Sequence, residues 1–464
     1  MNNDSLNVYN PFNGELIAEV PTQSQLQVDA TLTLGHQLSR NTQARLSLPE
    51  RIAILQKTAQ IMTSEAEALA LLATREGGKP LQDSQVEVAR AIDGIHLCIE
   101  GLRADAGQVV PMNLNAASNG RAAFTQKEPI GLVVAVSAFN HPLNLIVHQV
   151  APAVAVGCPV IVKPADDTPL SCLRFVEILH EAGLPSAWCQ AVVTPDLAIA
   201  ESLVTDERVA LFSFIGSARV GWMLRSKVAP GTRCLLEHGG AAPVVVYKDA
   251  DVSATVKTLT KGAFYHAGQV CVSVQRIFAH RDIAAQLGRE LAAAAEKLVL
   301  GNPEDPNTQV GPLIREREVE RVDQWVQEAL TLGAQVLCGA SKKGRYQYAP
   351  TVLTQVSEHC LLSRNEVFGP VAAIYEFDDD ASAFAQANDL PYAFQAAVFT
   401  QDLNNTMAAF KGLNASAIMV NDHTAFRTDW MPFAGLKQSG LGVGGIGHTM
   451  HEMQTEKMLV LPTV

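Results

Sequence analysis

Apolar residues recur with helical spacing in three long segments of the chain, at 49–75, 84–102 and 283–300. Spacings of three and four residues place such positions on one face of a helix, so each segment is predicted to be an amphipathic helix. Between the helices lie short runs rich in β-branched residues, at 132–136, 160–162, 209–214, 242–247 and 276–279. Because strands that alternate with helices form βαβ units, the pattern predicts an α/β fold with mostly parallel sheets.

The segment 131–221 predicts the order of a dinucleotide-binding domain. The expected elements are strands at 132–136, 160–162 and 210–214 and helices at about 144–156 and 171–182, followed by Gly216-Ser217 at the start of another helix. A second α/β unit follows, with predicted helices at 283–300 and 319–331 and a strand at 372–377. We therefore predict a Rossmann-like dinucleotide-binding domain formed by 1–107 and 128–238, and a second, catalytic α/β domain at 239–440.

Two apolar segments lie outside both predicted domains, at 108–125 and 456–464. Both alternate enough to be strands, and neither has a local partner in the predicted pattern. Unpaired strand edges favour association with another subunit. We therefore predict a small β oligomerisation extension made of 108–127 and 453–464, and a homodimer or homotetramer.

Composition limits the classes of function. Of the 464 residues, 48% are hydrophobic and 18% charged, which provides large buried cores and excludes general disorder. The formal net charge of −12 repels phosphate backbones and anionic membranes, so neither nucleic acid nor a membrane is an expected partner. The longest uncharged stretch, 129–162, is interrupted at Asn140, His141 and Pro142 and is too broken to span a bilayer.

The N-terminus shows no secretory signal pattern, and the eight cysteines are scattered without a Cys-x-x-Cys pair. This spacing argues against structural zinc and against a disulfide framework, so no metal is expected. Reduced thiols fit a cytoplasmic protein, which is the expected location.

Three residues suggest covalent chemistry. Cys271 lies between small residues and a β-rich run, and Glu237 lies at a junction of polar and apolar residues, in Leu-Leu-Glu-His-Gly-Gly. A thiolate nucleophile and a nearby carboxylate base form a workable catalytic pair. Asn140 follows a predicted strand and supplies an amide that can hold an oxyanion, although composition alone favours a turn cap before Pro142.

Seven motifs in order resemble the successive signatures of the aldehyde dehydrogenase superfamily. They cover almost the whole chain. The segments 426–433 and 139–144 are most similar to the lactaldehyde dehydrogenase-like branch. The motifs are the segments 128–143, 162–166, 214–217, 236–240, 268–271, 366–370 and 431–440.

The resemblance implies a mechanism for the three candidate residues. Cys271 would attack an aldehyde to form a thiohemiacetal, and the Asn140 side chain with the Cys271 N–H would hold the oxyanion. Loss of a hydride to the nicotinamide would leave a thioester. Glu237 would activate the water that hydrolyses it.

The resemblance also implies a cofactor, NAD, with NADP possible. Gly216-Ser217 at a helix start would meet the pyrophosphate. Lys163 and Asp166 would approach the adenosine ribose. A carboxylate there disfavours the 2′-phosphate of NADP, but Asp166 stands where many relatives carry Glu, and the shorter side chain leaves dual use open. Glu366 and Phe368 would position the nicotinamide ribose and ring.

The expected substrate pocket has an apolar floor. Val270 and Val272 flank the cysteine, which disfavours a doubly charged phosphate. Arg427 can bind a carboxylate of the substrate, since guanidinium pairs bidentately with carboxylate. We favour the alternative, a structural ion pair between Arg427 and Asp429. Two more residues are expected in the pocket walls, His141 and Trp430.

The predicted function is NAD(P)-dependent oxidation of a small, hydroxylated aldehyde to its carboxylic acid. A CoA-acylating semialdehyde dehydrogenase is the alternative, and the retained base Glu237 argues against it because such a base favours water as the acyl acceptor. A non-catalytic protein with the same fold is a third possibility, against which Cys271, Glu237 and Asn140 all argue.

Overall fold

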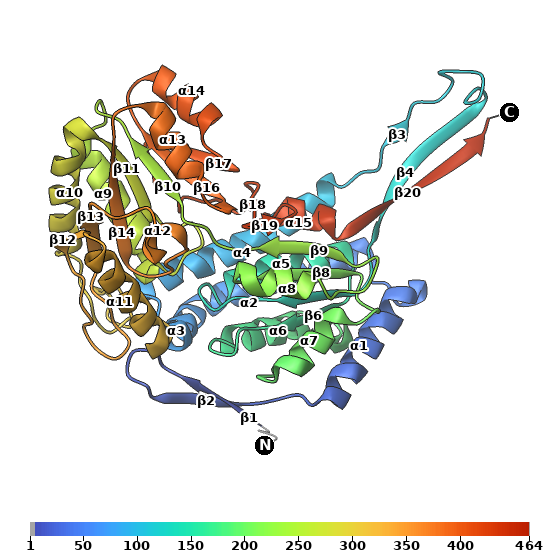
Figure 1. The fold of residues 1–464 in the computed structure, drawn as a ribbon. Coiled ribbons are helices and arrows are strands. Elements are labelled where there is room, and N and C mark those ends of the chain that lie inside the picture. Colours follow the sequence, from blue (N-terminus) through green and yellow to red (C-terminus); the bar gives the residue numbers. More distant parts are fainter. Residues whose placement is uncertain (1–4, 464) are drawn as a thin grey trace.

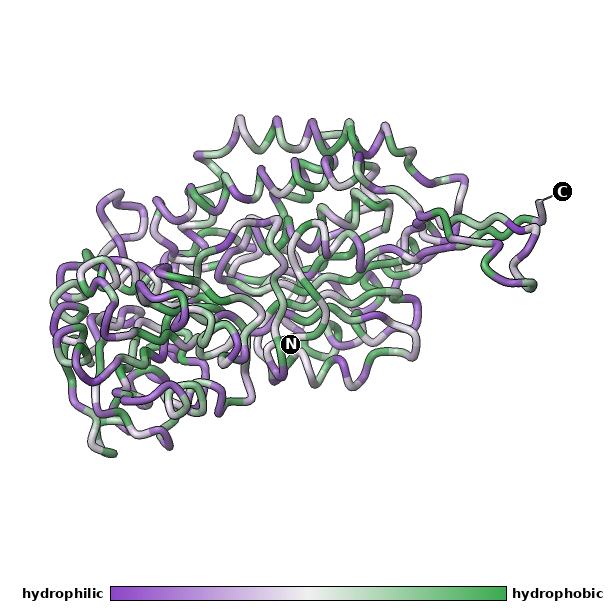
Figure 2. The backbone as a smooth tube through the Cα atoms, turned by 90° about the horizontal axis from the view of Figure 1, so that it is seen from above, coloured by the Kyte–Doolittle hydropathy of each residue, from purple (hydrophilic) through white to green (hydrophobic). Residues whose placement is uncertain are grey.

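Two large sheets form the two bodies of the molecule (Figure 1). The computed structural model describes residues 5–463. Figure 2 shows the same two bodies from above, with an arm projecting from one of them. The mixed α/β architecture with parallel sheets confirms the predicted fold class.

The first sheet has six strands in the order β19-β9-β8-β5-β6-β7. The strands β5 to β9 run parallel, and β19 joins antiparallel at the edge. Successive residues of β5 face opposite sides: Val133 and Ala135 belong to one buried cluster and Val134 to another. Burial of both faces explains why these strands are continuously apolar. The bounds are Val133–Val136 (β5), Val160–Lys163 (β6), Cys189–Ala191 (β7), Leu211–Ile215 (β8), Arg233–Glu237 (β9) and Gly440–Leu441 (β19).

Helices cover both faces of this sheet. One face packs against helices α2, α4, α5, α6 and α15, and the other against α1, α7 and α8. The bounds on the first face are Leu48–Ser64 (α2), Leu81–Ala104 (α4), Asn144–Val156 (α5), Leu170–Glu181 (α6) and Ile446–Glu452 (α15). Those on the second face are Gln25–Arg40 (α1), Leu197–Thr205 (α7) and Ala218–Arg225 (α8).

The second sheet has seven strands in the order β12-β13-β14-β11-β10-β16-β17. One large buried cluster joins its strands to helices α9, α10 and α11. The strands are Pro243–Val246 (β10), Arg276–His280 (β11), Gln335–Cys338 (β12), Thr351–Thr354 (β13), Val371–Phe377 (β14), Gln395–Phe399 (β16) and Ala417–Val420 (β17). The helices are Val252–Phe264 (α9), Arg281–Ala295 (α10), Glu316–Thr331 (α11), Leu361–Arg364 (α12), Asp380–Asn388 (α13) and Leu403–Gly412 (α14).

Two helix predictions need correction. The periodic segment 49–75 is two helices, α2 and α3 (Ala66–Gly77), which are separated at Glu65. The predicted helix 283–300 ends at Ala295, because Val299 and Leu300 run beside Val310 in an extended segment.

The arm consists of three antiparallel strands, β3 (Val109–Val110), β4 (Arg121–Pro129) and β20 (Gln454–Pro462). The two segments, which have no local partner in the sequence pattern, pair with each other across the chain: β20 runs antiparallel to β4 from Gln454–Pro129 to Pro462–Arg121. The arm still exposes apolar side chains, among them Phe124, Met458 and Leu459. Val464, the last residue of the predicted extension, lies outside the described residues. Small sheets also form from β1 (Ser5–Tyr9) with β2 (Leu16–Pro21), and from β15 (Tyr392–Ala393) with β18 (Leu436–Lys437).

Two kinds of feature are absent from residues 5–463. None of the described helices is long and apolar enough to cross a bilayer. Across the same residues, no group of three or more His, Cys, Asp or Glu side chains is placed to hold a metal ion.

Candidate active site

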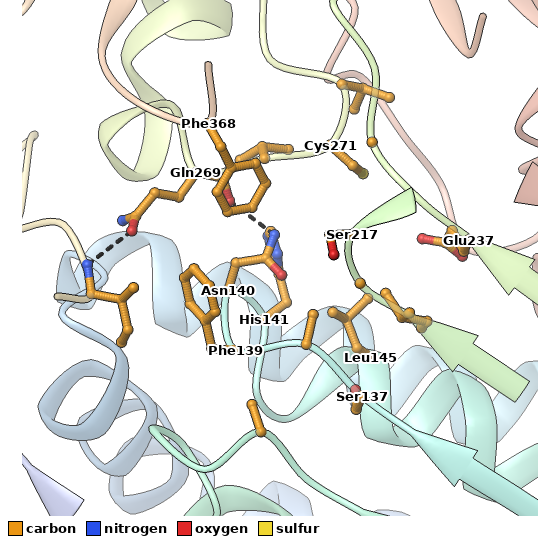
Figure 3. A pocket seen from close by; sticks show the side chains of 18 of the residues that line it. Ser137, Phe139, Asn140, His141, Leu145, Ser217, Glu237, Gln269, Cys271 and Phe368 are labelled. Atoms are coloured by element: carbon orange, nitrogen blue, oxygen red, sulfur yellow. Dashed lines mark hydrogen bonds between the residues drawn. The ribbon is translucent and has the colours of Figure 1, made fainter. Parts of the chain in front are cut away.

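A cavity of about 760 Å³ is lined by residues from both bodies of the molecule (Figure 3). The first sheet contributes the residues that follow the carboxyl ends of β5, β6, β8 and β9. Open α/β sheets bind ligands at this edge. The second body contributes residues near 271, 315, 366 and 427.

Cys271 lies in the wall of this cavity and is partly exposed to it. It follows the short 3₁₀ helix η3 (Tyr265–Gly268), where His266, Ala267 and Gly268 have left-handed φ values of 47°, 53° and 72°. Such backbone is costly for residues with a Cβ and is common at functional sites. Burial raises the pKa of the Cys271 thiol well above its usual range, and the charges of Glu237 and Glu366 raise it further.

Asn140 is buried in the turn between β5 and α5. Its Nδ2 donates a hydrogen bond to the main-chain oxygen of Gln269, at 2.9 Å. The Gln269 side chain is held in turn by the N–H of Ile314 at 3.0 Å and by the oxygen of Pro312 at 3.2 Å. The Asn140 amide is therefore anchored to the chain segment that carries Cys271, as Figure 3 shows.

Glu237 is the last residue of β9 and lies on another wall of the cavity (Figure 3). Its position opposite Gly440 of β19 fixes its backbone within the sheet. Burial raises the pKa of the Glu237 carboxyl, and the positive charge of Arg427 opposes that rise. The Oε1 atom of Glu237 lies 4.0 Å from Nη1 of Arg427.

Arg427 lies inside the cavity and does not form the predicted ion pair with Asp429. Arg90 takes that role instead, with Nη2 and Nε at 2.7 and 3.0 Å from the two carboxylate oxygens. Asp429 also accepts a hydrogen bond from His148 Nε2 at 2.7 Å. Arg90 reaches Asp429 from α4, a contact that closeness in sequence could not predict.

The Arg427 guanidinium is stacked and incompletely hydrogen-bonded. Its central carbon lies 3.6 Å from the centre of the Phe433 ring, and Nη2 donates to Nδ1 of His148 at 3.5 Å. Its Nε is buried without a hydrogen-bond partner among the described residues. Burial lowers the pKa of His148 to about 4, so this imidazole is neutral near pH 7 and adds no positive charge. Arg427 is therefore a mostly buried cation, 11% exposed, with capacity to bind an anion.

The other predicted pocket residues differ in position. His141, Val270 and Val272 line the cavity, and Tyr265 Oη lies 3.4 Å from Nε2 of His141. Burial lowers the pKa of His141 well below its usual range. Trp430 is 61% exposed and is not among the cavity residues, so the structure does not bring it to the site.

Sequence reasoning missed several residues that line the cavity. They come from separate elements, and Phe433 alone among them lies in one of the seven motifs; they are Arg90, Lys261, Tyr265, His423 and Phe433. Only the folded topology brings them together.

The far end of the cavity contains Asp166 and the turn that begins α8. Lys163, the last residue of β6, donates from Nζ to Oδ1 of Asp166 at 2.8 Å. Gly216 and Ser217 precede α8, and the Ser217 side chain makes no capping bond. The first N–H groups of a helix lack partners within it, so they suit an anionic ligand.

Glu366 and Phe368 line the cavity between these ends. The Oε1 of Glu366 is buried and lacks a hydrogen-bond partner among the described residues, and burial raises the pKa of this carboxyl to about 8. Phe368 has a left-handed φ of 46° and its ring meets that of Phe139 edge-on at 5.8 Å. A ligand with hydroxyl groups and an anionic centre fits this part of the cavity, since it would supply the partners that Glu366 and the α8 turn lack.

The fold and the cavity together indicate an α/β enzyme with two large sheets and a thiol in the cavity that both bodies line. The chain belongs to the aldehyde dehydrogenase family, because residues 1–459 match the sequence profile of that family. The 3-sulfolactaldehyde dehydrogenase of Priestia aryabhattai is 37% identical over 458 residues, which are 99% of this chain and 95% of that protein. The lactaldehyde dehydrogenase of Methanocaldococcus jannaschii is 32% identical over 465 residues, 99% of this chain and 98% of that one.

A solved structure agrees with these sequence matches. The glyceraldehyde-3-phosphate dehydrogenase of Methanocaldococcus jannaschii, crystallised with NADP, superposes with a TM-score of 0.93 at 32% identity and covers 100% of both chains. The family and the likeness to lactaldehyde dehydrogenases that the motifs predicted are thereby confirmed.

Proposed function

We propose that the protein oxidises a small, hydroxylated aldehyde to its carboxylic acid with NAD(P) as the hydride acceptor. The observation that carries this proposal is the convergence of Cys271, Asn140 and Glu237 on one cavity from three separate elements. A thiol, an amide donor and a carboxylate are the groups that acyl chemistry on an aldehyde carbon requires.

In the proposed mechanism the Sγ of Cys271 attacks the aldehyde carbon. Its thiol must first lose its proton to solvent, a loss that the charges of Glu237 and Glu366 oppose. The Asn140 amide and the Cys271 N–H stabilise the oxyanion, a role worth about 10²- to 10³-fold per donor. When bound, NAD(P) supplies the acceptor for the hydride that the thiohemiacetal loses. Glu237 then takes a proton from the water that hydrolyses the thioester.

The residues at the far end of the cavity fit the cofactor. The α8 turn with Gly216 and Ser217 would bind the pyrophosphate, and the unpaired Oε1 of Glu366 would accept from a ribose hydroxyl. Lys163 and Asp166, already paired, would face the adenosine ribose. We propose that either NAD or NADP can serve as the cofactor, and the solved structure of a relative with NADP supports the use of NADP.

For the substrate we propose a short hydroxyaldehyde, with Arg427 available to an anionic group on it. Relatives named for lactaldehyde and for 3-sulfolactaldehyde support a hydroxyl group, and the sulfonate of the latter supports an anion. Val270 and Val272 keep the floor of the cavity apolar. Arg427 is the buried cation closest to Glu237, and its Nε still lacks a partner among residues 5–463.

The remaining parts of the proposal concern assembly and location. The apolar side chains exposed on the arm support a homodimer or homotetramer, in which another subunit would cover β4 or β20. The scattered free cysteines support a cytoplasmic location.

The test is NADH or NADPH formation by the purified protein with lactaldehyde, glycolaldehyde, glyceraldehyde, succinate semialdehyde and an aliphatic series. Each aldehyde is assayed with NAD or NADP, with and without CoA, beside Cys271→Ala. Turnover of a hydroxyaldehyde that needs Cys271 and not CoA is the expected result. If turnover requires CoA, then CoA and not water is the acyl acceptor. If the protein binds the cofactor but oxidises none of these aldehydes, the non-catalytic alternative is favoured.

A further inference from the structure

A fully buried ion pair lies beneath the turn that carries Asn140. Lys79 and Glu87 contact each other through Nζ and Oε2, and both side chains have 0% exposure. Isolated ions are costly to bury, and this pair is retained although an apolar pair of similar volume would often be as stable. The pair therefore calls for an explanation beyond packing.

The two residues of the pair bind the main chain of one turn. Lys79 Nζ donates to the main-chain oxygen of Asn140 at 3.2 Å. The Oε1 of Glu87 accepts from the N–H groups of Leu143 and Asn144, each at 2.9 Å. The pair thus holds both ends of the segment 140–144, from the candidate oxyanion residue to the start of α5.

The position of Lys79 is itself fixed by the fold. It follows Gly78, which ends α3 with a left-handed φ of 71°. A Cβ at Gly78 would lie 2.7 Å from Cγ of Pro312, so the turn packs directly on the second body of the molecule. Pro312 also accepts the hydrogen bond from the Gln269 side chain.

Asn140 is consequently held at two points. Its carbonyl is held by Lys79, and one hydrogen of its amide by the oxygen of Gln269. A side-chain amide has two N–H donors, so the second remains for an oxyanion. We propose that Lys79 and Glu87 are positioning residues that fix Asn140 for oxyanion binding; this inference rests on the proposed function of Asn140.

The competing explanation is that the pair only stabilises the start of α5. Kinetic coupling to Asn140 separates the two explanations, since a merely structural pair would act equally with or without the Asn140 amide. A double-mutant cycle measures such coupling.

The experiment compares Lys79→Met, Asn140→Ala and their combination. We expect Lys79→Met to lower kcat about 10- to 100-fold with KM for the cofactor changed less than about threefold, because misplacement of a catalytic group by about 1 Å costs on that order. In the Asn140→Ala background the same substitution should change kcat less than about twofold. Lys79→Arg should recover part of the lost rate, since it restores a cation at this position.

Stability and catalysis are separated by two further variants. Lys79→Met/Glu87→Gln removes both charges and keeps an acceptor for the N–H groups of Leu143 and Asn144, so the Tm lost in Lys79→Met should return while kcat stays low. Glu76→Gln is the matched control. Glu76 is a fully buried carboxylate that accepts from Leu170 and Ser171 at the start of α6, and its effect on kcat should multiply with that of Asn140→Ala.

The cycle is run with two substrates, the best aldehyde and p-nitrophenyl acetate. The ester needs a nucleophile and an oxyanion donor but no hydride acceptor. Coupling of Lys79 to Asn140 with the ester alone would uphold the inference and reject the proposed oxidation. Three results would overturn the inference. The effects of Lys79→Met and Asn140→Ala on kcat could simply multiply, or kcat could return together with Tm in Lys79→Met/Glu87→Gln. The third is an absence of turnover with both substrates.

Discussion

Substitution of Arg427 provides the sharpest test of the site, because this residue is predicted to affect both the pKa of Glu237 and the KM for anionic aldehydes. Its Nη1 lies 4.0 Å from Oε1 of Glu237, and its guanidinium stacks on Phe433. Arg427→Met removes the charge and keeps an unbranched apolar side chain to pack on that ring. Arg427→Lys is the matched control, since it keeps the positive charge and loses the planar guanidinium with its paired N–H donors.

The first predicted effect is on the pKa of Glu237. Two unit charges 4.0 Å apart interact by about 4 kcal/mol at an effective dielectric of about 20, which is the upper limit here and corresponds to about three pH units. Because the cation favours the ionised carboxylate, its removal raises the pKa of Glu237 further. In the pH dependence of kcat, the acid limb should therefore move to higher pH by about one to three units, for neutral and anionic aldehydes alike.

The second predicted effect concerns anionic substrates alone. A hydrogen bond to a charged group contributes about 1.5–3 kcal/mol, so KM for an aldehyde bearing a carboxylate or sulfonate should rise about 10- to 150-fold in Arg427→Met. KM for a neutral hydroxyaldehyde should change less than about threefold. In Arg427→Lys the acid limb of the pH dependence of kcat should not move, because the positive charge is kept. An unmoved limb in Arg427→Met, together with equal KM changes for both classes, would refute both roles.

Three further predictions follow from buried groups. Glu237→Gln keeps the shape of the side chain but cannot accept a proton from water. Stopped-flow traces should therefore show a burst of one NADH per site, followed by turnover slowed about 10²- to 10⁴-fold. Unchanged turnover without a burst would exclude Glu237 as the base that activates water. Gly221→Ala should lower stability by about 1–3 kcal/mol, because the new Cβ would lie 2.0 Å from Cε1 of His238, and adding His238→Ala should restore the Tm; a Tm that does not fall contradicts this packing. Burial raises the pKa of Glu76 to about 7, so the folded state retains its proton longer than the unfolded chain does. The stability of the wild type relative to Glu76→Gln should therefore fall by about 2–3 kcal/mol as the pH rises from about 4.5 to 7, and calorimetry showing a constant or growing difference would refute the shifted pKa.

The sequence was sufficient for the parts of the fold that are specified locally. The strands at 133–136, 160–163 and 211–215 are short apolar runs bounded by turns, and burial on both sheet faces makes such runs easy to recognise. The break at Glu65 was not predictable in the same way, because apolar spacing continues across it from α2 into α3. The pairing of β4 with β20 escaped prediction because the two strands lie far apart in the chain.

The same distinction holds inside the cavity. Cys271, Asn140 and Glu237 each lie in a recognisable motif, and the structure brings all three to one cavity. Closeness in sequence suggests Asp429 as the partner of Arg427, whereas in the structure Arg90 reaches Asp429 from helix α4. Contacts made across the two bodies carry no local sequence signal.

This difference bears on where substrate choice resides. The residues proposed to break and form bonds lie in segments with their own turn chemistry, such as the left-handed run from His266 to Gly268 that precedes Cys271. The charged residues that surround the substrate space are placed by long-range contacts, as when Arg90 neutralises Asp429 and leaves Arg427 without that partner. An ion pair with Asp429 would draw Arg427 away from Glu237, whose carboxylate now lies 4.0 Å from the guanidinium. We therefore expect α4 to influence substrate choice through Arg90: exchange of Arg90 for a neutral residue should draw Arg427 toward Asp429 and away from the anionic group of the proposed substrate.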